Sequence, residues 1–359
     1  MTDQKEKQKI LFICGSMNQT TQMHQIADQL PDYKSYFTPY YPDGYGYIEF
    51  LGKFGLMDFS ILGGQAKQRT INYIKDHKLN LDLNGKNNDY DLVFTCSDML
   101  IQKNIRDKKV ILVQEGMTDP ENLGYHLAKK FKLHRWLGGT ATTGISDQYN
   151  LFCVASEGYK DFFINKGADP KKIVVTGIPN FDNCKQYLDN DFPHKGFVLV
   201  ATSDMRETYK YENRKKFILK AVALAKGRQI IFKLHPNENF KRAVKEIKKY
   251  APGSLIFHLE KIEPMIANCD ILLTRYSSVV YVGLALGKQV YSDFNLADLQ
   301  KLFPIQNGGT SAFNIAQAGR RLLAQPEESR VFVINKQEIP KYKLIQRFRE
   351  KRKLARIKH

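Results

Sequence analysis

The 359-residue sequence lacks the features that would assign it to a membrane-spanning, disulfide-rich or metal-binding class. No apolar run reaches the roughly 18 residues that a membrane-spanning helix needs, and the polar N-terminus has no signal-peptide core. The five cysteines are scattered, with no CxxC pair and no histidine at metal-ligand spacing. We therefore expect a cytoplasmic protein that holds no metal ion and no cofactor, with reduced core thiols at Cys14, Cys96 and Cys153.

Acidic residues are also few, because 37 of them face 55 basic residues and leave a net charge of +18. Residues 341–359 hold nine Lys or Arg residues and one Glu, with apolar residues at roughly helical spacing. Such a helix either lies on an anionic membrane surface, at the inner face of the membrane, or packs across the domains with its charges solvated. The chain shows no zinc-finger or RNP-type motif, so we do not expect nucleic-acid binding.

Apolar runs with β-branched residues alternate with helical patterns, which predicts an α/β fold with parallel strands. The predicted strands of the front half are 9–14, 92–96, 110–113, 151–154 and 173–176, and those of the back half are 197–201, 229–233, 255–257, 271–273 and 289–291. Helices are predicted at 158–165, 214–225 and 240–250. A chain of this length is typical of two domains.

The sequence between the two sets of strands breaks both patterns. Residues 177–182 (GIPNFD) and the polar stretch that follows them read as an irregular connection. We therefore expect an N-terminal Rossmann-like domain at 1–182, a hinge at 183–196, a C-terminal Rossmann-like domain at 197–330 and a basic helix at 331–359.

Glu115 is the first residue that indicates chemistry. It directly follows a predicted strand and precedes Gly116. Ligands of open α/β sheets bind outside the carboxyl ends of the strands. A carboxylate freed there by a glycine turn is able to act as a general base. The alternative is that Glu115 caps the next turn or pairs with a basic residue.

His235 ends a strand in the second half. Pro236 forces the residue before it into an extended conformation, which holds the imidazole at the mouth of the strand. The ring is able to donate to a phosphate oxygen there, and Lys233 adds positive charge. A lone histidine is more often structural, and that alternative stays open.

Two further sequences are typical of phosphate sites. Ser277 and Ser278 open a predicted helix, whose free backbone N–H groups and dipole favour an anion, although serine is also a common helix cap. Ser203 and Arg206 follow the first strand of the back half, and Arg206 is long enough to reach a donor phosphate. The turn at Ser16 does not continue as GxGxxG, so a dinucleotide site is not indicated.

In this order, the QEG, KLHP and YSS sequences of residues 114–116, 233–236 and 276–278 resemble motifs of a superfamily of GT-B glycosyltransferases. Its members include bacterial sialyl- and polysialyltransferases, capsule Kdo transferases and CDP-glycerol glycerophosphotransferases. The resemblance implies two Rossmann-like domains facing a central cleft, with a catalytic base, a nucleotide contact and a phosphate contact. The residues carried over to these roles are Glu115 for the first, His235 and Pro236 for the second, and Ser277 and Ser278 for the third. Gln114 departs from the acidic pair of the first motif.

The resemblance implies a metal-independent transferase. It would move a sugar or glycerophosphate from a CMP- or CDP-activated donor to a cell-surface glycan or a lipid-linked acceptor. The hinge sequence 174–179 also looks like that of nucleotide-sugar 2-epimerases, although residues 276–281 replace their serine-glycine-glycine motif and paired glutamates. A third alternative is a non-catalytic sugar-nucleotide-binding protein, which turnover of a cytidine-activated donor would exclude.

Overall fold

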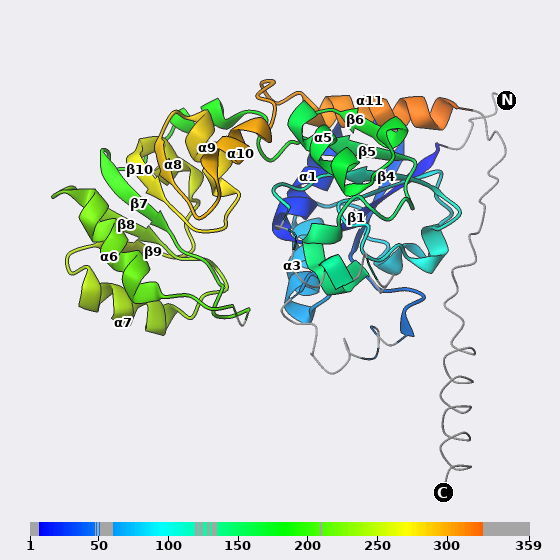
Figure 1. Cartoon of the computed structure of the whole chain (residues 1–359). Helices are drawn as coiled ribbons and strands as arrows, with labels where there is room; N and C mark the ends of the chain where they lie inside the picture. Colours follow the sequence, from blue (N-terminus) through cyan, green and yellow to red (C-terminus); the bar gives the residue numbers. More distant parts are fainter. Residues whose placement is uncertain are drawn as a thin grey trace, which may run out of the picture. The chain divides into compact units, whose positions relative to one another are not determined.

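The structure is a computed structural model that describes residues 7–46, 48, 50, 60–118, 121, 125–127, 130, 135–208 and 210–325. It contains two parallel sheets (Figure 1). The first is six-stranded, in the order β2-β1-β3-β4-β5-β6. Its strands are β1 (Lys9–Cys14), β2 (Lys34–Pro39), β3 (Leu92–Thr95), β4 (Lys109–Val113), β5 (Leu151–Val154) and β6 (Ile173–Val175). The helices within this part of the sequence are α1 (Met17–Asp28), α3 (Gly64–Asp76) and α5 (Glu157–Lys166), with 3-10 turns at Leu83–Gly85, Lys103–Ile105, Arg135–Thr142 and Pro170–Lys172.

The second sheet is five-stranded, in the order β11-β10-β7-β8-β9. Its strands are β7 (Phe197–Ala201), β8 (Ile230–Lys233), β9 (Leu255–Phe257), β10 (Cys269–Leu273) and β11 (Gln289–Tyr291). The accompanying helices are α6 (Arg214–Ala225), α7 (Phe240–Tyr250), α8 (Glu263–Asn268), α9 (Val279–Ala285) and α10 (Leu296–Lys301), and a 3-10 turn at Cys184–Leu188 precedes β7.

The central strands are buried on both faces. Every residue of β3 and β7 is buried, and the inner residues of β1 and β4 are buried as well. Helices cover both faces of a parallel sheet, so its central strands read as continuous apolar runs rather than as alternating patterns. This explains why these strands stand out in the sequence.

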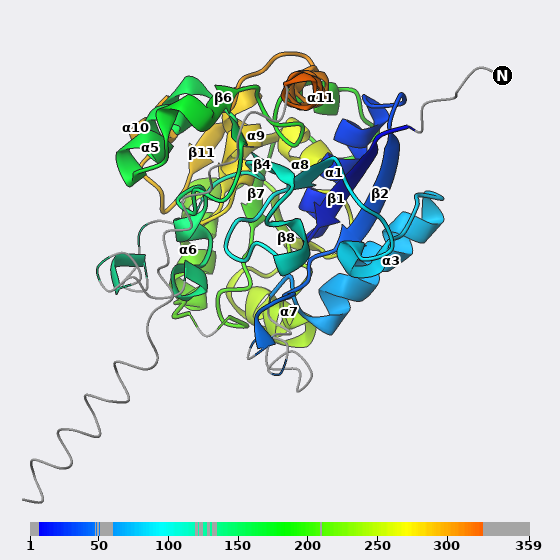
Figure 2. The ribbon, with the colours of Figure 1, turned by 90° about the vertical axis from the view of Figure 1, so that its right-hand side faces the viewer.

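Helix α11 (Ser311–Ala324) follows the second sheet in sequence but packs against the first (Figures 1 and 2). Ile315 is fully buried in the same core cluster as Phe94 of β3. Lys109 Nζ of β4 donates to the carbonyl of Leu322 at 2.9 Å. Residues 311–324, which fall within the predicted C-terminal domain at 197–330, thus pack against the first sheet, while the predicted domain limits stay a prediction.

Elements of the two halves are also joined by direct hydrogen bonds. The hydroxyls of Tyr159 in α5 and Tyr281 in α9 lie 2.7 Å apart, and both side chains are almost fully buried. Ser156 Oγ donates to the carbonyl of Leu302. The backbone N–H of Ile305 donates to the carbonyl of Ala155. Buried polar pairs of this kind hold a contact in one geometry, because breaking them leaves unsatisfied groups.

Most elements lie where the sequence predicts them. The ten predicted strands are present, within two residues at each end, and the three predicted helices are present too. Strand β2 was not predicted. The five cysteines are buried free thiols, and no helix in the described part of the chain is long and apolar enough to cross a bilayer. The basic helix expected at 331–359 lies outside the described residues.

Candidate functional site

Two side chains from the first helix hold the carboxylate of Glu115. Ser16 caps the N-terminus of α1 and donates its hydroxyl to Oε1 of Glu115 at 2.5 Å. Gln19 donates its side-chain amide to Oε2 at 2.6 Å. Both carboxylate oxygens therefore accept a hydrogen bond, and together these fix the plane of the group. In the described chain no basic side chain forms an ion pair with Glu115.

Gln114 has a different task from its neighbour. Its side chain is 1% exposed, accepts from the backbone N–H of Ala155 at 2.9 Å and donates to the carbonyl of Gly116 at 2.7 Å. The amide thereby ties the end of β4 to the end of β5 and closes the glycine turn that presents Glu115. A carboxylate has no donor for the Gly116 carbonyl. The structure thus gives a local reason for glutamine at the position where the motif that the sequence resembles carries an acid.

Ser16 also lines a cavity of about 580 Å³. The lining comes from the turn after β1, from α3, and from the loops after β7 and β8. Pro236 and Asn237 come from the last of these loops. Among the described residues of this lining, Arg69 of α3 is the one cationic side chain, and Asp204 and Glu207 supply two carboxylates. A cavity of this size accommodates a sugar nucleotide or a similar small molecule.

His235 stands next to this cavity, beside Pro236. Its Nδ1 accepts the backbone N–H of Asn237 at 3.2 Å, which places the proton of the neutral ring on Nε2. Burial lowers the pKa of the His235 imidazole, and the side chain of Asp204, 3.6 Å from Nδ1, opposes that effect only in part. The ring is therefore neutral near pH 7 and presents Nε2–H as a donor.

Three other predicted residues do not line this cavity. Lys233 is 6% exposed, and its Nζ donates to the carbonyls of Leu234 and His258. Arg206 forms two hydrogen bonds of 2.9 Å with Glu246. Ser203 has a buried hydroxyl that finds no hydrogen-bond partner within the described chain. Their roles at a donor phosphate stay predictions.

Ser277 and Ser278 precede α9, as the sequence predicts. Ser277 Oγ accepts from the backbone N–H of Val279 at 3.5 Å, and the Ser278 side chain makes no capping hydrogen bond. Neither serine lines the cavity that contains Ser16. The proposed phosphate contact at these two serines is therefore not tested by the geometry.

No protein-family model and no curated protein match the chain in sequence. Its fold, however, is similar to solved structures. A protein from Listeria monocytogenes assigned as a UDP-N-acetylglucosamine 2-epimerase is 14% identical, with a TM-score of 0.55 over 90% of this chain and 99% of that chain. The UDP-GlcNAc 2-epimerase from Neisseria meningitidis bound to UDP-GlcNAc is 15% identical, with a TM-score of 0.52 over 87% of this chain and 100% of that chain.

The fold is GT-B. This confirms the fold class predicted from the sequence, and at these identities the likeness shows the fold alone. In this GT-B chain the carboxyl ends of β1 and β4 lie on the same edge of the first sheet, with β3 between them. Ser16 and Glu115 follow these two strands, and this common edge is what brings them together.

The sequence did not single out Ser16 and Gln19 as partners of Glu115. A signal was present, since Ser16 follows a strong strand at the edge where ligands bind, and Gln19 comes one helical turn later. The sequence of the turn itself, which lacks GxGxxG, indicates neither a dinucleotide site nor a partner for Glu115. Arg69 carries no comparable signal, because it lies within an ordinary polar helix.

Proposed function

We propose that this chain is a GT-B transferase that moves a sugar or glycerophosphate group from a nucleotide-activated donor to a hydroxyl acceptor, with Glu115 as the general base. The observation that carries the proposal is the carboxylate itself. It lies at the carboxyl end of a parallel strand, its two oxygens are oriented by Ser16 and Gln19, and Ser16 lines a cavity of sugar-nucleotide size. Such preorganisation is what a base needs before an acceptor binds.

The proposed reaction is a direct displacement. The acceptor hydroxyl gives its proton to the Glu115 carboxylate while its oxygen bonds to the transferred group, and the bond from that group to the donor phosphate breaks. His235 Nε2–H donates to the leaving phosphate, and the start of α9 at Ser278 offers a second donor. Protein donors stabilise the leaving charge in this scheme, so we propose no metal requirement.

The nucleotide of the donor is part of the proposal. The motifs around His235 and Ser277 resemble cytidine-nucleotide pockets, so CMP or CDP should raise the melting temperature more than UDP or GDP at equal concentration. The Neisseria neighbour contains UDP-GlcNAc, which favours uridine. A larger shift with UDP in the same titration would replace cytidine by uridine and leave the base assignment standing.

Nucleotide-sugar 2-epimerase is the second candidate, favoured by the two solved neighbours of that type. The two functions differ in what they require. A transferase releases nucleotide only when an acceptor is present, whereas an epimerase inverts C2 of UDP-GlcNAc without one. Proton NMR of the protein with UDP-GlcNAc alone, and with the cytidine donor plus a glycan acceptor, distinguishes them. If neither epimerisation nor transfer occurs, the remaining candidate is a non-catalytic sugar-nucleotide-binding protein.

The acceptor is proposed to be a cell-surface glycan or a lipid-linked precursor, built in the cytoplasm at the inner face of the membrane. The support is the basic sequence at 341–359, with its nine Lys or Arg residues. Under this proposal the basic sequence would bind the anionic membrane surface where lipid-linked acceptors lie.

A further inference from the structure

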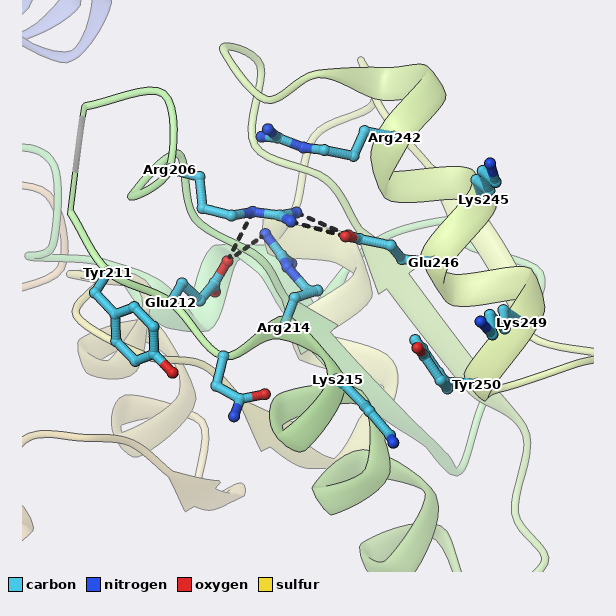
Figure 3. A pocket seen from close by; sticks show the side chains of 11 residues that line it. Arg206, Tyr211, Glu212, Arg214, Lys215, Arg242, Lys245, Glu246, Lys249 and Tyr250 are labelled. Atoms are coloured by element: carbon cyan, nitrogen blue, oxygen red, sulfur yellow. Dashed lines mark hydrogen bonds and ion pairs between the residues drawn. The ribbon is translucent and has the colours of Figure 1, made fainter.

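A second cavity, of about 610 Å³, lies at the start of α6, along α7 and beside the loop that precedes α6 (Figure 3). It shares no lining residue with the cavity at Ser16. Two carboxylates line it, Glu212 and Glu246. Its cationic lining residues are Arg206, Arg214, Lys215, Arg242, Lys245 and Lys249.

Arginines form ion pairs with both carboxylates of this second cavity. Figure 3 shows Arg206 paired with Glu246 through two hydrogen bonds of 2.9 Å. Arg214 Nη2 lies 2.9 Å from Glu212, whose side chain is fully buried. Arg206 and Arg214 therefore neutralise the two carboxylates, and the lysines of the cavity add positive charge.

The lysines of the second cavity have no carboxylate partner within the described part of the chain. Lys245 and Lys249 project from successive turns of α7, and Lys215 lies at the start of α6 (Figure 3). The ammonium groups of Lys215 and Lys249 lie 5.6 and 5.3 Å from the centre of the Tyr250 ring. Both ammonium groups thus lie against the same aromatic ring of the lining, where an anion would screen their charge.

The arginines of the second cavity are already paired with carboxylates. Arg214 is 3% exposed and pairs with Glu212 and with Glu238, whose side chains are fully buried. Arg242 pairs with Glu207. The unpaired positive charge of the cavity therefore comes from its lysines, whose ammonium groups bind phosphate oxygens as point charges.

We propose that this second cavity binds an anion with two or more phosphate groups. Lys215, Lys245 and Lys249 receive the phosphate groups. The lining of Tyr211 and Tyr250 leaves room for an organic group attached to the phosphates. The same diphosphate chemistry occurs in soluble metabolites and in diphosphate-linked lipids. The site lies apart from Glu115, so it does not depend on the proposed reaction.

Isothermal titration of the full chain with inorganic pyrophosphate tests the site. The double variant Lys245→Glu/Lys249→Glu should lose at least 10-fold in affinity. The matched control is Lys241→Glu/Lys248→Glu, which changes charge equally on the same helix at exposed positions outside the cavity lining. An equal loss in both variants would reduce the effect to long-range charge and overturn the proposal. Should the first variant fail to fold, Lys215→Met should give a smaller loss.

Vesicles distinguish the sources of the phosphates. If the ligand is lipid-borne, the wild type should bind vesicles with a diphosphate lipid better than vesicles with a monophosphate lipid at equal surface charge. Lys245→Glu/Lys249→Glu should abolish this difference. A soluble ligand predicts pyrophosphate binding without this vesicle preference. If the wild type binds neither pyrophosphate nor the diphosphate vesicles, the proposal is wrong, and the proposed transfer reaction is unaffected.

Discussion

At the scale of single residues, Glu115 and Gln114 divide two tasks that the sequence motif presents together. Glu115 is held from α1, with both carboxylate oxygens accepting. Gln114 points into the sheet and joins the ends of β4 and β5. Only the first residue is a candidate for the proposed chemistry. The position of the second is explained by the need for one donor and one acceptor in the same buried side chain.

Gln114→Glu should therefore destabilise the protein. The new carboxylate keeps the contact with the Ala155 N–H but faces the Gly116 carbonyl without a proton, so we expect a loss of about 1–3 kcal/mol in the free energy of unfolding. Urea unfolding measures it. Gln300→Glu makes the same chemical change at an exposed position of α10 and should stay within about 0.5 kcal/mol of wild type. Equal stability of the two variants would contradict the structural role of Gln114.

At the scale of elements, the sequence predicted the strands because buried parallel strands are continuous apolar runs. The sequence did not predict strand β2, because it is an edge strand that is exposed at its first residue and ends in a proline. The positions of the candidate site residues at strand ends were predictable from the strand pattern. The contacts between these residues were not predictable, because they depend on the conformations of the loops. Examples are the hydrogen bonds of Ser16 with Glu115 and of Arg206 with Glu246. The return of α11 to the first sheet left no local signal either.

Gly319 tests the packing of α11. A Cβ atom there would lie 2.9 Å from Phe94 Cζ and 3.2 Å from Leu92 Cδ2, which is closer than ordinary contact. In an open helix Gly→Ala stabilises by about 1 kcal/mol, whereas overpacking a core costs about 1–3 kcal/mol. Gly319→Ala should therefore lower the melting temperature, and Arg321→Ala, at an exposed position of the same helix, should not. A more stable Gly319→Ala protein would mean that α11 does not approach the sheet this closely.

At the scale of the whole molecule, helix α11 packs into the core of the first sheet, whereas the sequence at 341–359 is strongly basic. A protein ending at residue 325 keeps α11 and should melt near the full-length value, but lose salt-sensitive sedimentation with anionic vesicles, since its basic sequence is gone. A protein ending at residue 310 exposes the core around Phe94 and should aggregate. Unchanged vesicle binding by the first truncation would remove the membrane role of residues 341–359.

The proposed reaction involves both sheets, because the proposed base Glu115 follows a strand of the first sheet and His235 follows a strand of the second. Single-turnover transfer by Glu115→Gln, measured together with nucleotide affinity, tests this account most directly. The glutamine is nearly isosteric and is able to keep the Ser16 hydrogen bond, but it does not accept the proton of the acceptor hydroxyl. We predict a transfer rate at least roughly 100-fold lower with nucleotide affinity near wild type. An unchanged transfer rate would contradict the account by removing Glu115 from the mechanism.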